Sequence, residues 1–191
     1  MTTNLATRSD YRTGTWKLDP IHSELSFWVR HLKISKVRGI FESFDVTVTV
    51  PEDPSQISVV ATVDVSSVNT KQEQRDAHLR TSDFFLADEH PTITFTSTGI
   101  TVDGDEFALT GDLSLRGVTK SVTLKGEFGG VITDDYGRTK AGANASVTIN
   151  RQDFGVNWNA ALEAGGFTLG DDVTITVDLQ VDLQPEDGAA A

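Results

Sequence analysis

Apolar and polar residues alternate along most of this chain, and this period of two limits the fold more than any other feature. Successive side chains of a strand point to opposite faces of a sheet, so alternation predicts strands with one apolar face each. We expect eight main strands and a further one in "GTWKLDP". The eight lie in "SELSFWVRH", "FDVTVTV", "QISVVATVDVSSV", "TITFTSTGITV", "EFALTGDLSLRG", "VTKSVTLKGEFGGVI", "KAGANASVTINR" and "DVTITVDLQVDL".

The strand pattern predicts an all-β architecture, either a sandwich or a closed antiparallel barrel. The "VDGDE" turn at 102–106 indicates a hairpin. Helix-forming residues without alternation predict one short helix at 71–80, and an irregular stretch follows Asn157 through "ALEAGG". A length of 191 residues suits one domain. We expect that domain at 13–184, with flexible ends at 1–12 and 185–191.

Composition excludes several classes of function. The chain has no cysteine, which rules out disulfides, thiolate metal sites and cysteine nucleophiles. The net charge of −12 disfavours nucleic acid as a partner, and contact with an anionic lipid surface would need a local basic patch. The N-terminus has no apolar run of signal-peptide length, and no later segment approaches a membrane span. We therefore expect a cytoplasmic protein.

The histidines do not predict a metal or catalytic site. His22 and His31 are nine residues apart, so a regular strand points them to opposite faces. The segment "DPIHSE" contains Asp19, His22 and Ser23, which lie too close on an extended chain to converge as a triad. A Gly-x-Ser-x-Gly elbow, a phosphate loop and a dinucleotide fingerprint are all absent from the sequence. We expect neither catalysis nor a bound cofactor or metal.

Small residues on the inner face favour a cavity. The strand from 139 to 150 presents Ala141, Ala143 and Ala145, and the strand from 118 to 132 includes Gly126 and Gly130. An eight-stranded barrel is wide enough either to be filled by side chains or to hold one small ligand. The alternative is that large residues on the opposite wall fill the space, as dense packing demands.

A basic cluster interrupts the acidic chain between two strands. Arg30, Lys33, Lys36 and Arg38 lie close together with no acid among them, and their position predicts a barrel rim. Three roles stay open: a solvated turn, a collar for an anionic head group, or a contact with an anionic membrane surface.

Five stretches in the same order resemble the YceI-like polyisoprenoid-binding proteins. The first is "LDPIHSELSFWVRHLKISKVRGIFESFDVTV", and the second, "QEQRDAHLRTSDFFLADEHPTITF", resembles that family's helix and the strand after it. The others are "GDLSLRGVTKSVTLKGEF", "INRQDFGVNWN" and "GDDVTITVDLQV". The resemblance extends over residues 14–183.

This resemblance implies a lipocalin-like eight-stranded barrel that binds, transports or stores a lipid without catalysis. The implied ligand is a polyprenyl diphosphate, an isoprenoid quinone or another long-chain amphiphile in an elongated apolar cavity. Many members are periplasmic. We expect ligand contacts from the inward residues, the polar strand ends and the aromatic residues after the helix, and head-group contacts from the rim. The ligand-binding candidates are His22, Leu25, Phe27, Val29, His31, Val63, His78, Phe84, Phe85, Phe128, Ala143, Ala145 and Trp158, and the rim candidates are Arg30, Lys33, Lys36, Arg38 and Arg75.

Two other classes of function stay open from the sequence. One is an enzyme that acts on an isoprenoid lipid with His22, His31 or His78 as acid or base. The other is a scaffold or interaction protein with a filled barrel. A homodimer and transient contact with a membrane surface are also compatible with the sequence.

Overall fold

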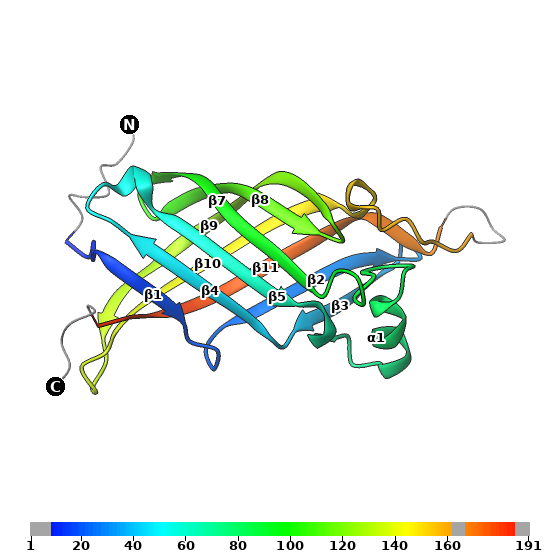
Figure 1. Cartoon of the computed structure of the whole chain (residues 1–191), viewed down its shortest axis with the longest axis horizontal. Helices are drawn as coiled ribbons and strands as arrows, with labels where there is room; N and C mark the ends of the chain where they lie inside the picture. The colour runs from blue at the N-terminus through cyan, green and yellow to red at the C-terminus, as the bar shows by residue number, and fades with distance from the viewer. Residues whose placement is uncertain (1–8, 162–166, 186–191) are drawn as a thin grey trace.

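The computed structural model describes residues 9–161 and 167–185, and these form a β-barrel with one short α-helix at one end (Figure 1). Three short 3₁₀ helices lie at Pro54–Gln56, Val65–Ser67 and Arg151–Phe154. The other elements are β1 (Gly14–Leu18), β2 (Glu24–His31), β3 (Ser35–Phe41), β4 (Phe44–Val50), β5 (Ser58–Asp64), β6 (Val68–Asn69), α1 (Glu73–Arg80), β7 (Thr92–Asp103), β8 (Glu106–Leu115), β9 (Val118–Thr133), β10 (Thr139–Asn150) and β11 (Leu169–Leu183).

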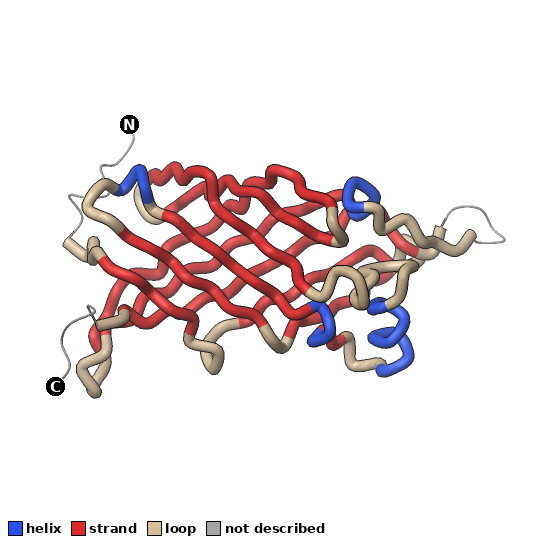
Figure 2. Tube along the Cα trace, viewed as in Figure 1, coloured by secondary structure: helices blue, strands red, loops and turns tan. Residues whose placement is uncertain are grey.

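The barrel closes through pairing of its first and last strands. The strand order β1-β4-β5-β7-β8-β9-β10-β11 becomes a ring because β1 also pairs with β11, where Trp16 lies opposite Leu183. Each pairing in the ring is antiparallel. The all-β prediction of a closed eight-stranded antiparallel barrel is therefore confirmed. Strands make up the wall, and loops and helices gather at its two ends (Figure 2).

The structure contains two strand segments, β3 and β6, beyond those that the sequence predicts, and two bends separate neighbouring segments of the barrel wall. β11 pairs with β2 over most of its length and with β1 only at its end, so β1 and β2 are two parts of one edge that separate at residues 19–23. β3 and β4 are likewise separated only by Glu42 and Ser43, and they pair with β2 and β1 respectively. The stretch "GTWKLDP" thus forms the separate strand β1, as expected.

The helix predicted at 71–80 is present as α1 (Glu73–Arg80), and it lies at one end of the barrel (Figure 1). The buried carboxylate of Asp76 accepts hydrogen bonds from the Thr70 backbone N–H at 2.9 Å and from the Thr70 hydroxyl. The Arg75 guanidinium donates to the Thr70 hydroxyl at 2.7 Å and to the Thr70 carbonyl at 2.8 Å. These bonds attach the helix to the chain just after β6.

The most tightly packed part of the core lies at the same end. Val65, Val68 and Phe154 are the largest fully buried side chains, and Phe84 and Val156 pack with them. Within the described ranges no helix is long and apolar enough to cross a membrane. Residues 1–8, 162–166 and 186–191, which include most of "ALEAGG" and most of the expected flexible ends, lie outside the described residues.

Candidate ligand-binding site

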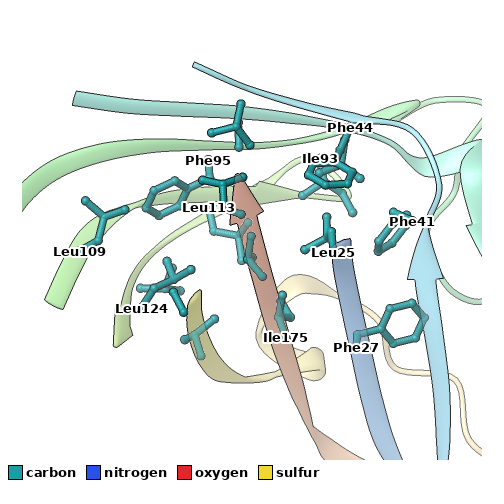
Figure 3. Close-up of a pocket in the computed structure, with 18 of the residues that line it drawn as sticks. Leu25, Phe27, Phe41, Phe44, Ile93, Phe95, Leu109, Leu113, Leu124 and Ile175 are labelled. Atoms are coloured by element: carbon teal, nitrogen blue, oxygen red, sulfur yellow. The ribbon is translucent and has the colours of Figure 1, made fainter. Parts of the chain in front are cut away.

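A cavity of about 590 Å³ runs through the barrel. Its wall consists of the inward-facing side chains, every second residue, of nearly every strand. Side chains from opposite sides of the barrel therefore face one another (Figure 3). Leu25 and Phe27 of β2 face it, as do Phe95 of β7, Leu124 of β9 and Ile175 of β11. The volume lies within the range of about 300–1,000 Å³ that is typical of small-molecule sites.

Small inward residues account for part of the free space. Ala143 and Ala145 point inward in the middle of β10, yet both remain partly exposed because they face the cavity and not a packed core. The alanine pattern in the sequence therefore corresponds to cavity wall.

Gly126 has a different role from the one that the sequence suggests. It lies opposite Phe107, and a Cβ atom at position 126 would be 2.7 Å from the Phe107 ring and 2.0 Å from the Asn144 carbonyl oxygen. The missing side chain makes room for an aromatic ring that lies against the wall, and it does not add to the cavity. Gly130, with φ of 103°, has no atom within 4 Å of where a Cβ would lie.

Aromatic rings surround the α1 end of the cavity. Phe84 and Trp158 lie 5.3 Å apart, and His78 meets both rings edge-on at 5.0 Å. A second group contains Phe41, with its ring centroid 5.5 Å from that of Phe27 and 5.9 Å from that of Phe85. All six line the cavity. The expectation that aromatic residues after the helix lie at one end of the barrel agrees with this arrangement.

Polar groups also line the cavity at this end. Nε2 of His78 lies 2.7 Å from Oδ2 of Asp83. The guanidinium of Arg151 donates to the carbonyls of Val156 at 2.7 Å and Trp158 at 2.9 Å, which fixes the loop that carries the tryptophan. Burial lowers the pKa of Arg151, and nearby Asp171 opposes that effect in part.

At the opposite end, the segment just before β1 borders the cavity. Asp10, Tyr11 and Arg12 line it there, together with Asp105 of the β7–β8 turn. The Tyr11 hydroxyl donates to the Pro51 carbonyl at 2.6 Å. Burial, followed by the nearby carboxylates of Asp53 and Glu52, raises the pKa of Tyr11. The cavity thus has polar groups at both ends and an apolar middle.

Most of the predicted ligand-binding residues line this cavity. The strand residues among them come together because the period of two fixes which side of each strand faces inward, whereas His78, Phe84, Phe85 and Trp158 come from α1 and from loops. In the structure the lining includes Leu25, Phe27, Val29, His31, Val63, Arg75, His78, Phe84, Phe85, Phe128, Ala143, Ala145 and Trp158.

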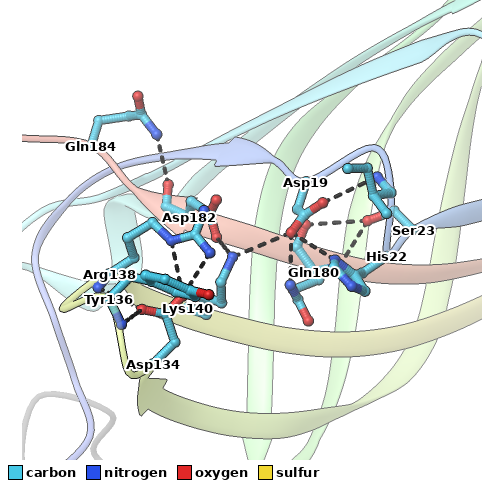
Figure 4. Close-up of polar contacts among 11 residues, drawn as sticks. Asp19, His22, Ser23, Asp134, Tyr136, Arg138, Lys140, Gln180, Asp182 and Gln184 are labelled. Carbon is cyan, nitrogen blue, oxygen red and sulfur yellow. Dashed lines mark hydrogen bonds and ion pairs between the residues drawn. The ribbon is translucent and has the colours of Figure 1, made fainter.

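His22 is the exception among the ligand-binding candidates. It lies in the bend between β1 and β2, outside the cavity, and its side chain is 60% exposed. Its Nδ1 is 2.9 Å from Oδ2 of Asp19 (Figure 4). The Ser23 hydroxyl instead bonds the backbone of Gln180, donating to its carbonyl and accepting from its N–H. The structure therefore forms no triad from Asp19, His22 and Ser23.

Asp19 connects this bend to the barrel wall. Its carboxylate accepts from Nε2 of Gln180 at 2.8 Å and from Nζ of Lys140 at 3.2 Å, and Lys140 also pairs with Asp182 (Figure 4). Burial acts to raise the pKa of Asp19, but hydrogen bonds from His22, Lys140 and the Ile21 N–H outweigh it, so the pKa falls well below its usual value. The pairing with Asp182 raises the pKa of Lys140. We call Asp19, Lys140, Gln180 and Asp182 the bend cluster.

The predicted rim lies mostly on the outside of the barrel. Of the five predicted rim residues, Arg75 alone lines the cavity. Arg30 lies opposite Lys36, and Arg38 lies opposite Trp28. All four alternate with the inward-facing residues of β2 and β3, so their side chains point out of the barrel. Lys33 lies in the turn between these strands. Lys36 and Arg38 belong to strand β3, in a stretch that the sequence-based prediction treats as a connection, and the alternation that turns Leu25 and Phe27 inward turns these cations outward.

Several lining residues were absent from the sequence-based prediction. Phe41 and Phe107 have the inward parity, so the alternation could have identified them. Arg151, Thr168 and the segment at 10–12 lie outside regular strands, where no period indicates direction. Among the described residues, no three His, Asp or Glu side chains are grouped closely enough to hold a metal ion.

Comparison with known proteins agrees with this architecture. The protein "UPF0312 protein SA2479" of Staphylococcus aureus (strain N315) is 43% identical over 157 residues, which cover 81% of this chain and 90% of the relative. The crystal structure of the Campylobacter jejuni YCEI protein matches with a TM-score of 0.70 and 30% identity, over 81% of this chain and 90% of that one.

A more distant structure shares the fold alone. It is a polyisoprenoid binding domain from Saccharophagus degradans, with a TM-score of 0.64 and 16% identity, over 91% of this chain and all of that one. The family model described as "YceI-like domain" matches residues 16–181. With this match over nearly the whole barrel, the chain belongs to the YceI-like domain family.

Proposed function

We propose that this protein binds a long-chain isoprenoid or a similar amphiphile in its barrel and carries or stores it without chemical change. The observation that carries the proposal is the apolar cavity of about 590 Å³, which continues between polar groups at the two barrel ends. The distant structural neighbour named as a polyisoprenoid binding domain supports the same class of ligand.

Transfer of apolar surface supplies enough free energy for such binding. Each buried CH₂ contributes roughly 0.8 kcal/mol, so one isoprene unit contributes on the order of 3–4 kcal/mol before the cost of ordering the chain. A few units buried against Leu124, Phe95 and Ile175 would bind tightly with no polar contact. Polar groups at the ends, such as Arg75 and His31, would then orient a quinone, alcohol or diphosphate head.

A second candidate is an enzyme that acts on such a lipid. It is favoured by one observation, that His78 faces the cavity while its Nε2 lies 2.7 Å from the Asp83 carboxylate. A histidine oriented by a carboxylate is a common general base. The pair is about half exposed, and we infer that its role is to hold the aromatic end of the cavity.

The test is mass spectrometry of an organic extract from the purified protein, with Ala145→Phe as the comparison. Ala145 lies partly exposed on the cavity wall, so an aromatic ring there should block the cavity without the cost of about 1–3 kcal/mol that overpacking a filled core brings. We expect lipid from the wild type, much less from Ala145→Phe, and little change in the melting temperature of the lipid-free forms.

Ser146→Phe is the matched control, because Ser146 is the next residue on the exposed outer face of the same strand. It should retain wild-type amounts of lipid. A strongly destabilised Ala145→Phe variant that still holds wild-type lipid would contradict the proposal. Conversion of an added lipid by the wild type, abolished by His78→Ala, would favour the enzyme instead.

A further inference from the structure

The hairpin between β2 and β3 has an exposed apolar tip. Ile34 is 83% exposed and Leu32 is 36% exposed in the turn at 32–34. Phe167, 60% exposed, directly precedes Thr168, whose carbonyl accepts a hydrogen bond from the Leu32 N–H at 2.8 Å. We call Leu32, Ile34 and Phe167 the apolar tip. A group of large side chains in water at one end of a barrel indicates a surface that is covered by something else.

Basic residues lie directly behind the apolar tip. Lys33 is in the turn itself, and Arg30, Lys36 and Arg38 follow on the outer face of the hairpin. Nζ of Lys36 lies 3.5 Å from the ring centroid of Trp28, so an aromatic ring is part of the same face. Residues 25–41 contain no acid in a chain whose net charge is −12.

The adjoining acids do not cancel this charge. Glu24 and Glu42 flank the hairpin at its far end from the tip. At the start of the neighbouring strand β11, Asp171 accepts a hydrogen bond from Gln152 at 2.7 Å and lies 3.4 Å from the Arg151 guanidinium. Asp172 is a further exposed acid there, next to Val173, which pairs with Val29. Arg30, Lys33, Lys36 and Arg38 outnumber these two carboxylates, so the hairpin keeps a local net positive charge on an acidic protein.

The backbone of the tip is suited to an apolar environment. The Leu32 N–H bonds Thr168 and the Ile34 N–H donates to the His31 carbonyl at 3.1 Å, so neither donor needs water. Leu32 and Lys33 both adopt left-handed conformations, with φ of 51° and 61°, at positions where hairpins usually have Asn or Gly. Strained backbone conformations of this kind cluster at functional sites.

We propose that the apolar tip and the cations behind it form a docking surface for an anionic phospholipid bilayer. Apolar side chains would enter the head-group region, while the lysines and arginines pair with anionic lipid at its surface. His31 and Thr168, which adjoin the tip, also line the cavity. Docking would therefore place one end of the cavity against the membrane. A nucleic acid would use the charge but not the exposed Ile34, so the bilayer is the better match.

Vesicle co-sedimentation of the full chain tests this surface, using phosphatidylcholine vesicles with and without phosphatidylglycerol. We expect binding only with phosphatidylglycerol and at low salt. Ile34→Ser should weaken it on the order of tenfold, and Lys33→Gln with Arg38→Gln on the order of tenfold or more. The controls are Ile132→Ser, at a position 64% exposed on β9, and Lys17→Gln with Lys125→Gln, which remove the same charge elsewhere. Both controls should bind like the wild type.

A fluorescent label gives a second readout, because the chain has no cysteine and a single introduced one is labelled alone. An environment-sensitive dye at Ile34→Cys should shift to the blue with anionic vesicles, and the same dye at Ile132→Cys should not. Absence of wild-type binding to phosphatidylglycerol vesicles would overturn the proposal, as would equal loss in Ile34→Ser and Ile132→Ser. Binding of duplex DNA that depends on Lys33 and Arg38, without vesicle binding, would assign the face to nucleic acid. None of these outcomes depends on what the cavity holds.

Discussion

At the scale of single residues, the side chains of the barrel wall divide between filling space and leaving it open. Phe107 lies opposite Gly126, and its ring occupies the space that a side chain at position 126 would need. Ala145 on the next strand has no such ring opposite, since it pairs with Gly126 and Val177, and it stays partly exposed to the cavity. From the sequence alone, Gly126 and Ala145 are both small inward residues. The side chains around them give them opposite roles, because one accommodates a ring and the other leaves the cavity open.

Replacing Gly126 with alanine tests this distinction. The new methyl group would meet a backbone oxygen at 2.0 Å, which cannot rotate away, as well as the Phe107 ring. We expect Gly126→Ala to lower the free energy of unfolding by about 1–3 kcal/mol, measured by urea denaturation. The control is Gly99→Ala, since nothing lies within 4 Å of a Cβ at that position. Equal stability of the two variants would contradict this, because it would show that β10 and Phe107 shift to accommodate the new methyl group at no cost.

At the scale of secondary-structure elements, the bend cluster holds the strand break at residues 19–23 against β11. The Asp19 N–H donates to the Gln180 carbonyl at 2.8 Å, and Ser23 accepts from the Gln180 N–H at 2.9 Å. These bonds occupy the edge of β11 between its pairing with β2 and its pairing with β1. The segment "DPIHS" therefore ties the bend between β1 and β2 to β11.

This cluster predicts a specific dependence of stability on pH. The folded-state pKa of Asp19 is lowered, so its contribution is complete above the unfolded pKa of about 3.9 and is lost as the pH falls below that value. We expect Asp19→Asn to cost about 1.5 kcal/mol at neutral pH, with the difference from wild type shrinking below about pH 4. Chemical denaturation across pH measures this, with the exposed Asp45→Asn as the control. A difference that stays constant into acid would mean that charge on Asp19 is not involved.

The sequence predicts a secondary-structure element well where apolar and polar residues repeat with a regular period, and poorly elsewhere. Alternation predicts most of the strands and the direction of Leu25 and Phe27, and its absence predicts α1, but β3 (Ser35–Phe41) lies in a stretch that the prediction treats as a connection. The same alternation, applied to Arg30 and Arg38, would have placed them outside, but their position in a connection suggested a rim. Neither the bend at 19–23 nor the contacts of Arg151 could be predicted, because both depend on partners far away in the chain.

At the scale of the whole molecule, the cavity links stability to its contents. A ligand that binds only the folded barrel stabilises it by about 2.7 kcal/mol when present at a hundred times its dissociation constant. We expect removal of the bound lipid to lower the melting temperature by roughly 5–10 °C for a domain of this size, and its return to restore it. Scanning calorimetry of extracted and reloaded protein is the measurement. The Ala145→Phe variant should show no such shift, and a wild-type melting temperature indifferent to lipid would argue against a cargo in the barrel.

The closing contact between β1 and β11 has a consequence for synthesis. Trp16 pairs opposite Leu183, so the first strand to leave the ribosome must wait for the last one before the ring can form. At about 5–20 residues per second the delay is on the order of ten seconds. During that time the apolar inner faces of all the intervening strands are open to other chains in the cell. We therefore expect production of this barrel to depend on protection of the nascent chain as well as on the stability of the finished fold.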